Sequence, residues 1–298
     1  MLPFKTPSKE WLTVITVFHD MAREAPRTLY SLSREYQLQA VGLKYRVIAI
    51  DHGSSTPLAH LPYRGLDLEY RRIETQAVSP VMAVNQAVES VSSEFVMINI
   101  DGARILSPGV LMYAYQACEA FRNPFVYTLG WHLGPDIQNI SMTMGYSQHQ
   151  EDLLLAELDW EHNGYRLFEK SSLAGSSAGG FLKPIAESNC FLIRTSTWVE
   201  LGGFHPDFQT PGGGLANLDF FKRVCEQTDI TPVCLLGEGT FHQIHGGVAT
   251  NVPREKHPMP GFQEEYKSIH GQPWQKKQDL EPVYFGRLHK VARRFISI

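Results

Sequence analysis

The sequence predicts an α/β fold with a mostly parallel central sheet, and three observations lead to it. Apolar runs rich in β-branched residues alternate with segments of helical apolar spacing over the first 130 residues. Two of these runs end on an acid in a turn-forming context, at Asp51-His52-Gly53 and at Asp101-Gly102. Ligands of open α/β sheets bind at the carboxyl ends of the strands. The sequence therefore predicts a nucleotide-binding half with its site at those ends.

Each element of this half follows from its local pattern. A near-continuous apolar run, as at 12–18, is typical of a strand buried on both faces. Ser79-Pro80 predicts a helix start, because serine caps helices and proline suits their first turn. The elements expected in order are a strand at 12–18, a helix at 27–37, strands at 45–50 and 70–74, a helix at 79–91, a strand at 94–100, a helix at 108–121 and a strand at 125–129. Strands that alternate with helices indicate crossover connections and a parallel sheet.

The second half has a different texture. A long acidic helix is expected at 150–163, followed by a Gly/Ser-rich stretch at 171–180. That stretch is interpreted as a mobile loop or, alternatively, as a flexible linker between domains. A strand at 189–194 and a helix at 218–226 follow, and residues 246–298 are expected to form an irregular extension.

Composition excludes several classes of protein. The 298 residues carry a net charge of −4, and no Lys/Arg run before the C-terminus exceeds two residues, so nucleic acid is not expected as a partner. No segment approaches the ~20 apolar residues of a membrane span, and the N-terminus lacks a signal peptide's apolar region, so a cytoplasmic protein is expected. The basic end at 287–295 is either an amphipathic helix on the inner membrane face or a solvated helix. The cysteines expected to be buried, reduced thiols are Cys118, Cys190, Cys225 and Cys234.

Several segments together resemble one enzyme family. Residues 13–18, 27–32 and 51–55 are similar to the opening of family 2 glycosyltransferases, which have a GT-A fold. Further matches follow in the family's order, at Ala83-Val84-Asn85-Gln86-Ala87, at Asn99-Ile100-Asp101 and at Gly202-Gly203-Phe204 with the helix after it. The resemblance covers about residues 10–245. It implies a Rossmann-like central sheet flanked by helices.

The resemblance also implies an activity and a domain division. Enzymes of this family move a sugar from a nucleoside diphosphate sugar to a saccharide or lipid-linked acceptor, usually in surface-polysaccharide biosynthesis. Residues 1–245 would form the GT-A domain, with the nucleotide-sugar half at 10–130, the acceptor half at 131–245 and the extension at 246–298. One rival is a catalytically inactive nucleotide-sugar-binding relative that acts as a partner protein. A second is a nucleotidyltransferase, although the first strand is not followed by the Gly-rich basic loop that a triphosphate needs.

The resemblance implies a donor site at the strand ends. Asp51 would contact the base or ribose, since a carboxylate accepts hydrogen bonds from either, and Gly53 would let the backbone approach. The segment that begins with Phe18 would line the same pocket. The nucleotide-sugar-binding residues expected are Phe18, His19, Asp51, Gly53, Ser54, Asn85, Asn99 and Asp101.

A metal site is expected beside the diphosphate. Asn99 and Asp101 fall where the family has its Asp-x-Asp motif, whose oxygens hold Mn²⁺ or Mg²⁺ against the leaving group. Because Asn99 carries no charge, weaker metal affinity is expected. His242 and His245 are further candidate ligands, and the alternative is that they are structural histidines. On a helix they would share a face, whereas on a strand only one could bind.

The catalytic base departs from the family pattern. Family members that invert configuration place a Glu-Asp pair after the Gly-Gly-Phe turn, and the corresponding residues here are Ala216-Asn217. An amide cannot accept the proton, so Asn217 is no base. Asp219 is a candidate, although it is spaced to pair with Arg223 four residues on. Other candidates are Glu187, Asp207 and His205. Otherwise the enzyme is retaining, or inactive.

The acceptor site is expected around glycines and an aromatic ring. Gly213 and Gly214 precede the last predicted helix, where free backbone and a helix amino end suit a sugar or diphosphate. A flexible loop without contacts is the alternative. Trp131 follows a predicted strand and is the best candidate for stacking on a sugar ring, whereas Trp198 suits the core.

Overall fold

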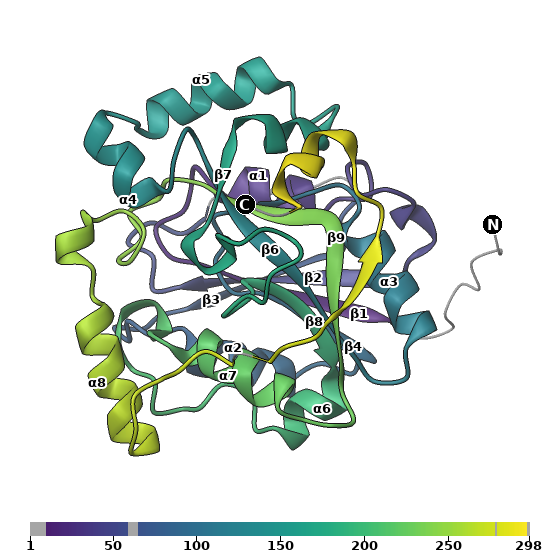
Figure 1. The fold of residues 1–298 in the computed structure, drawn as a ribbon, viewed down its shortest axis with the longest axis vertical. Helices are drawn as coiled ribbons and strands as arrows, with labels where there is room; N and C mark the ends of the chain where they lie inside the picture. The colour runs from purple at the N-terminus through teal and green to yellow at the C-terminus, as the bar shows by residue number, and fades with distance from the viewer. Residues whose placement is uncertain (1–9, 59–64, 278, 297–298) are drawn as a thin grey trace.

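The computed structural model describes residues 10–58, 65–277 and 279–296, and a ten-stranded sheet forms its centre (Figure 1). The strand order is β10-β9-β6-β8-β4-β1-β2-β3, with β5 paired to β9 and β7 paired to β6. The strands are β1 (Leu12–Phe18), β2 (Tyr45–His52), β3 (Leu68–Ile73), β4 (Phe95–Asn99), β5 (Arg104–Leu106), β6 (Pro124–Leu133), β7 (Ser171–Leu173), β8 (Cys190–Arg194), β9 (Thr231–His242) and β10 (Val283–Gly286). The strands β3, β2, β1 and β4 are parallel, whereas β8 runs antiparallel to β4 and β6. The predicted α/β class with a mostly parallel sheet is confirmed.

Helices cover both faces of this sheet. The α-helices are α1 (Ala25–Ser31), α2 (Val81–Glu89), α3 (Val110–Ala120), α4 (Gln138–Ser141), α5 (Gln148–Leu158), α6 (Thr195–Glu200), α7 (Ala216–Cys225) and α8 (Met259–His270). One cluster of buried side chains joins α2 and α7 to the sheet through Val84 and Phe220. A second joins α1 and α3 to it through Leu29 and Leu111. Burial of each such side chain contributes roughly 1.5–3 kcal/mol, so the sheet is fixed from both sides.

The packing brings the candidate residues to one edge of the sheet. Because β1, β2 and β4 are parallel, their carboxyl ends lie together, and Asp51 is opposite Phe18 in the register. Asn99 pairs with Thr16 of β1 and with Cys190 of the antiparallel β8. The start of β8 therefore lies at the same edge as the end of β4.

Three expectations about secondary structure were wrong. The first helix ends at Ser31 rather than residue 37, since the Gln37 side chain donates to the Ser31 carbonyl (2.7 Å) and folds the chain back. Residues 171–180 are not an unstructured loop, because they contain β7 and a 3₁₀ helix (Gly175–Ser177), and β7 pairs with β6. The segment 246–298 is more regular than expected, since it supplies α8 and the edge strand β10.

The C-terminal tail packs on the domain. Lys290–Phe295 form a 3₁₀ helix in which Phe295 is buried, with its ring centroid 5.4 Å from that of Trp131. The Phe295 carbonyl also accepts from the amide of Phe181 (2.8 Å). The apolar side of the predicted basic helix is therefore used inside the protein.

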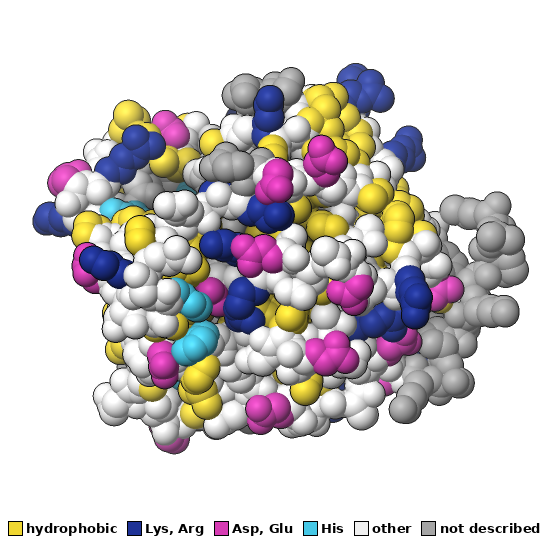
Figure 2. Space-filling view, turned by 60° about the horizontal axis from the view of Figure 1, so that its bottom comes forward, with side chains coloured by type: hydrophobic (Ala, Val, Ile, Leu, Met, Phe, Trp, Pro, Cys, Tyr) yellow, Lys and Arg dark blue, Asp and Glu magenta, His cyan; other side chains and the backbone are white. Residues whose placement is uncertain are grey.

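The remaining expectations concern cysteines, charge and the membrane. All four cysteines are buried and unpaired, as predicted. On the face in Figure 2, Lys and Arg side chains are interspersed with Asp and Glu and form no single basic patch. No helix of the described residues has the length and apolarity needed to cross a membrane. Residues 1–9, which carry the expectation about a signal peptide, lie outside the described residues.

Candidate functional site

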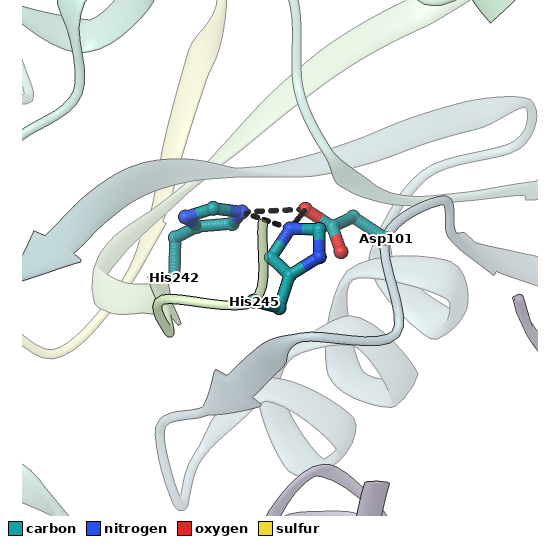
Figure 3. Close-up of side chains that lie close together, drawn as sticks. All are labelled: Asp101, His242 and His245. Carbon is teal, nitrogen blue, oxygen red and sulfur yellow. Dashed lines mark hydrogen bonds and ion pairs between the residues drawn. The ribbon is translucent and has the colours of Figure 1, made fainter. Parts of the chain in front are cut away.

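Three side chains converge beyond the end of β4 and β9 (Figure 3). The Oδ2 atom of Asp101 lies 2.7 Å from Nε2 of His242 and 3.7 Å from Nε2 of His245. The two Nε2 atoms are 3.1 Å apart. Three potential ligand atoms thus face a common point, which is the arrangement that a metal ion requires.

The backbone explains how both histidines reach Asp101. His242 is the last residue of β9, where it pairs with Arg104 of β5 and His132 of β6. The chain then leaves the strand, so His245 returns to the same side. Neither the helix nor the strand alternative applies, because β9 ends at His242 and His245 lies beyond it.

A chain of amide hydrogen bonds fixes the tautomer of His242. Nδ1 of His242 lies 2.7 Å from Oε1 of Gln138, and Nε2 of Gln138 donates to the His242 carbonyl (3.0 Å). Oε1 of Gln138 also accepts from Nδ2 of Asn251 (3.1 Å), whose own Oδ1 accepts three backbone amides of residues 245–247. Gln138 therefore presents an acceptor, so His242 carries its proton on Nδ1 and directs a lone pair on Nε2 at Asp101.

The protonation states of Asp101 and His242 determine whether the cluster can bind a cation. Burial lowers the pKa of His242 to about 4, so its ring is neutral at physiological pH. Burial opposes ionisation of Asp101, but the two imidazoles and Arg104 hold its pKa well below the usual range. With the proton of His242 on Nδ1, the ionised Asp101 oxygen and the Nε2 lone pair at 2.7 Å are both acceptors, so a proton or a metal ion must lie between them. The residues present thus fit a divalent ion.

The donor set distinguishes between the expected ions. Mg²⁺ prefers oxygen ligands, whereas imidazole nitrogen suits transition metals. One carboxylate and two imidazoles therefore fit Mn²⁺ better than Mg²⁺. Asn99, the other expected ligand, is fully buried, and both atoms of its amide lack a hydrogen-bond partner.

Asp51 is fully buried at the end of β2 and retains one unused oxygen. Its Oδ2 accepts from the Tyr70 hydroxyl (2.6 Å) and the Leu58 amide (3.1 Å), and lies 3.2 Å from Nη1 of Arg72. Burial acts to raise the pKa of Asp51, but the hydrogen bonds and Arg72 lower it. Its Oδ1 has no hydrogen-bond partner. This buried carboxylate thus keeps one oxygen without a partner at the strand end where a base or ribose is expected.

The turn after Asp51 is rigid. Gly53 has a φ of +65°, and a Cβ there would lie 2.6 Å from the Thr75 carbonyl, so only glycine fits without strain. The Ser54 hydroxyl accepts the backbone amide of Asp20 (2.9 Å). His19 is largely exposed, and its Nδ1 lies 2.8 Å from the His52 carbonyl. These residues line the strand end as expected.

Two expected donor-site residues have structural roles instead. The Phe18 ring is fully buried, and a Cβ on Gly102 would lie 2.3 Å from it, so the ring packs under the chain and offers no face to a nucleotide. The Asn85 amide bonds both backbone groups of Phe204, donating to its carbonyl (2.8 Å) and accepting from its amide (3.1 Å). Both ends of that amide are used, so Asn85 holds the turn 202–204 rather than a ligand.

The candidate bases differ sharply in their surroundings. Asp219 is buried, with Oδ2 on Arg223 (2.7 Å) and Oδ1 on His270 (3.1 Å). The structural pairing with Arg223 is therefore present, and it occupies Oδ2 of Asp219. His205 and Asp207 lie at the surface, 3.9 Å apart. In contrast, Glu187 is partly buried, and its Oε2 accepts from Nδ2 of Asn217 (3.0 Å).

The predicted acceptor platform is part of the core. Trp131 is fully buried in β6 within 6 Å, between ring centroids, of Phe168, Phe181, Phe241 and Phe295. A ring enclosed in this way cannot stack on a sugar, so the expectation for Trp131 was wrong.

The glycines before α7 are also enclosed. Gly213 and Gly214 have positive φ values of +82° and +53°. A Cβ on Gly214 would lie 2.2 Å from the Thr210 hydroxyl and 2.8 Å from the Glu265 carboxylate, and one on Gly213 would lie 3.3 Å from Val81. The glycines therefore accommodate the chain's own side chains, with Glu265 of α8 accepting from the amides of Gln209 and Thr210.

Sequence reasoning did not identify several residues of the site. Gln138, Asn251 and His132 order the cluster of Asp101, His242 and His245, and Arg104 is buried beside Asp101 with its Nε 3.7 Å from Oδ2. Their partners lie up to 113 residues away along the chain. The sequence around the two amides has no local pattern that indicates a role, whereas Arg104, only three residues after Asp101, could have been suspected.

No known family model matches this chain, and no curated protein does. Among solved structures, TarS of S. aureus is similar. TarS 1–349 in complex with UDP-GlcNAc aligns with a TM-score of 0.50 at 13% identity, over 80% of this chain and 59% of that one. The same segment with UDP gives 0.50 and 13%, over 78% and 60% of the two chains. A further TarS structure gives 0.51 and 13%, over 78% and 37%.

This similarity concerns the fold. The chain spans less than two thirds of the TarS structures it matches, and an identity of 13% carries no residue roles from one protein to the other. The central ten-stranded sheet with helices on both faces is consistent with the fold of those structures. The chain therefore has a GT-A-like glycosyltransferase fold.

Proposed function

We propose that this chain is a glycosyltransferase that moves a sugar from a nucleoside diphosphate sugar to a hydroxyl of a saccharide or lipid-linked acceptor. The observation that carries the proposal is the Asp101, His242 and His245 cluster at the edge of a GT-A-like sheet. Asp51, with its unused carboxylate oxygen, lies at the same edge of the sheet and would take the base or ribose. Solved structures of the similar TarS contain UDP and UDP-GlcNAc, which makes UDP-sugars the first donors to test.

The cluster would hold Mn²⁺, which would neutralise charge on the diphosphate leaving group. The protein's own part is to keep the ligand atoms in place. Gln138 holds His242 in the tautomer that binds metal, and Arg104 adds a positive charge beside Asp101. Asn99 remains a proposed contact of the donor, since its buried amide has unused donors and an acceptor.

The acceptor and the cellular setting are further parts of the proposal. We place the reaction in surface-polysaccharide assembly at the inner face of the membrane, and the four buried thiols support a reducing compartment. The tail would contribute through charge rather than insertion, because Arg287, Lys290 and Arg293 are exposed while Phe295 is buried. Co-sedimentation with anionic vesicles, which salt should abolish, tests this contact.

Calorimetric titration with UDP, GDP, dTDP and CMP, each with and without Mn²⁺, tests the proposed function. We expect one nucleotide to bind, and to bind more tightly with metal. Asp101→Ala should remove the metal-dependent gain, whereas Asp279→Ala, at a side chain 83% exposed, should keep it. Binding of none of the four would refute the function.

One rival keeps a specific observation in its favour. Asn217 occupies the position where the resembling family has its acid, as a catalytically inactive nucleotide-sugar-binding protein would. Nucleotide binding without any turnover of a donor would favour that rival.

A further inference from the structure

Glu187 lies at the edge of the sheet that carries the metal cluster. The residues before β8 run past the end of β4, because the two strands are antiparallel, and the Asn189 carbonyl accepts the Ile100 amide (3.1 Å). Glu187 is two residues from that contact, and Asp101 is one residue from it. One of the acids that the sequence offered as a candidate base thus lies on the segment that meets the chain beside Asp101.

Polar groups from three further elements surround this carboxylate. Nδ2 of Asn217, near the start of α7, donates to Oε2 of Glu187 (3.0 Å). Ser176 acts to lower the pKa of this carboxylate, and the buried guanidinium of Arg104 lies within electrostatic reach. Nε and Nη1 of Arg104 have no hydrogen-bond partner. These are the contacts of a group kept in one orientation, with a fixed positive charge nearby.

The surroundings suit a group that exchanges a proton. Burial raises the pKa of Glu187, while Asn217, Arg104 and Ser176 act to lower it. A base works best when its pKa approaches the working pH, so a carboxyl with a raised pKa is better matched than an exposed one. Ser176 also lines a cavity of about 350 Å³ with Gly175, Gly179 and Lys183.

We propose that Glu187 is the general base of the transfer reaction and that Asn217 is the residue that positions it. This rests on the proposed function and names the missing base of that site. The acceptor oxygen attacks the anomeric carbon, its proton passes to Glu187, and the bond from that carbon to the diphosphate oxygen breaks. The electron pair of that bond leaves with the nucleoside diphosphate. Such a single displacement inverts the anomeric configuration.

The assignment also explains the asparagine at position 217. Two carboxylates within hydrogen-bond distance cannot both ionise, so an acid at 217 would raise the pKa of Glu187 further. An amide donates to the carboxylate instead and adds no charge. In the family the base lies at the start of the helix that corresponds to α7, whereas here it would be the hydrogen-bonded neighbour of that position, on the segment before β8.

Glu187→Gln tests the base, since it keeps the size and removes the proton acceptor. The probe is hydrolysis of UDP-GlcNAc in the presence of Mn²⁺, followed by UDP release, with UDP affinity from calorimetry as a separate readout. We expect turnover to fall 100-fold or more, because general bases contribute about 10²–10⁴-fold, while UDP affinity stays within twofold. Glu157→Gln, at a side chain 70% exposed, is the matched control and should keep wild-type turnover.

Asn217→Asp tests positioning through the pH profile. The added carboxylate should move the acid limb of the rate up by about half a pH unit or more, which a purely structural role would not do. Wild-type turnover in Glu187→Gln, or an unmoved limb in Asn217→Asp, overturns the assignment. A wild type that binds UDP but hydrolyses no UDP-GlcNAc at any pH also overturns it. A wild type that binds none of the four nucleotides instead refutes the proposed function.

Discussion

The amide chain behind His242 can be tested through metal affinity alone. In Gln138→Leu, Nδ1 of His242 loses the acceptor that fixes its tautomer, and Nδ2 of Asn251 loses its acceptor too. Outer-shell partners of metal-binding histidines typically contribute 10–100-fold in affinity. At about 1.4 kcal/mol per factor of ten, we expect Gln138→Leu to weaken Mn²⁺ binding by about 1.4–2.7 kcal/mol. Calorimetric titration with MnCl₂ measures this change without donor or acceptor.

A second substitution at the same position separates tautomer control from packing. Gln138→Glu keeps an acceptor oxygen for His242 and Asn251 and loses only the donor to the His242 carbonyl. We expect its Mn²⁺ affinity to equal or exceed that of the wild type, because a carboxylate makes the imidazole more basic. Gln150→Leu, at an exposed position of α5, controls for the substitution itself. If Gln138→Leu is folded by circular dichroism and binds Mn²⁺ within threefold of the wild type, the reasoning is refuted.

Three further predictions concern buried groups. Burial raises the pKa of the Glu238 carboxyl from 4.5 to about 7, so between these pH values the folded chain keeps a proton that the unfolded chain has released. The free energy of unfolding should therefore fall by about 3 kcal/mol as the pH rises through this range. Urea unfolding at pH 5 and 7.5 measures this fall, and it should be absent in Glu238→Gln. Asp219→Ala should lower the free energy of unfolding in urea by about 2–4 kcal/mol, because it leaves the partly exposed Arg223 without its partner. Donor turnover should stay within twofold of the wild type, and a 100-fold loss would instead identify Asp219 as a base. Phe295→Ala should destabilise the fold by about 3 kcal/mol through its contact with Trp131, and an unchanged melting temperature would contradict that packing.

The first strands could be predicted because their apolar runs are unbroken. The strand β9 was missed, since Gly237, Glu238 and Gly239 interrupt its run. The structure explains that interruption: a Cβ on Gly239 would lie 2.1 Å from the Trp131 ring, and Glu238 accepts from Ser107 (2.5 Å). Both reasons involve partners more than 100 residues away, which no local pattern contains.

The candidate site divides in the same way. Asp51 and Asp101 could be predicted because each ends an apolar run, and strand ends are where α/β sheets bind ligands. The turn between His242 and His245 could not, because its shape depends on Asn251 accepting three amides of the turn. Whether His242 and His245 face the same point therefore depends on Asn251, which the spacing of the two histidines does not indicate.

Some residues shared with an enzyme family hold the fold together and do not take part in the reaction. Asn85 bonds the turn 202–204 at Phe204, and Arg223 donates to the carbonyls at Leu201 (2.8 Å) and Gly203 (2.6 Å), so the turn is held from α2 and from α7. That clamp ties α7 to the turn through its last helical turn, and the amide that meets Glu187 lies in the first turn of the same helix. The residues shared with the family therefore hold the framework in place. Within that framework the base can lie at Glu187 instead of at position 217 of α7, so an asparagine at position 217 does not by itself imply loss of activity.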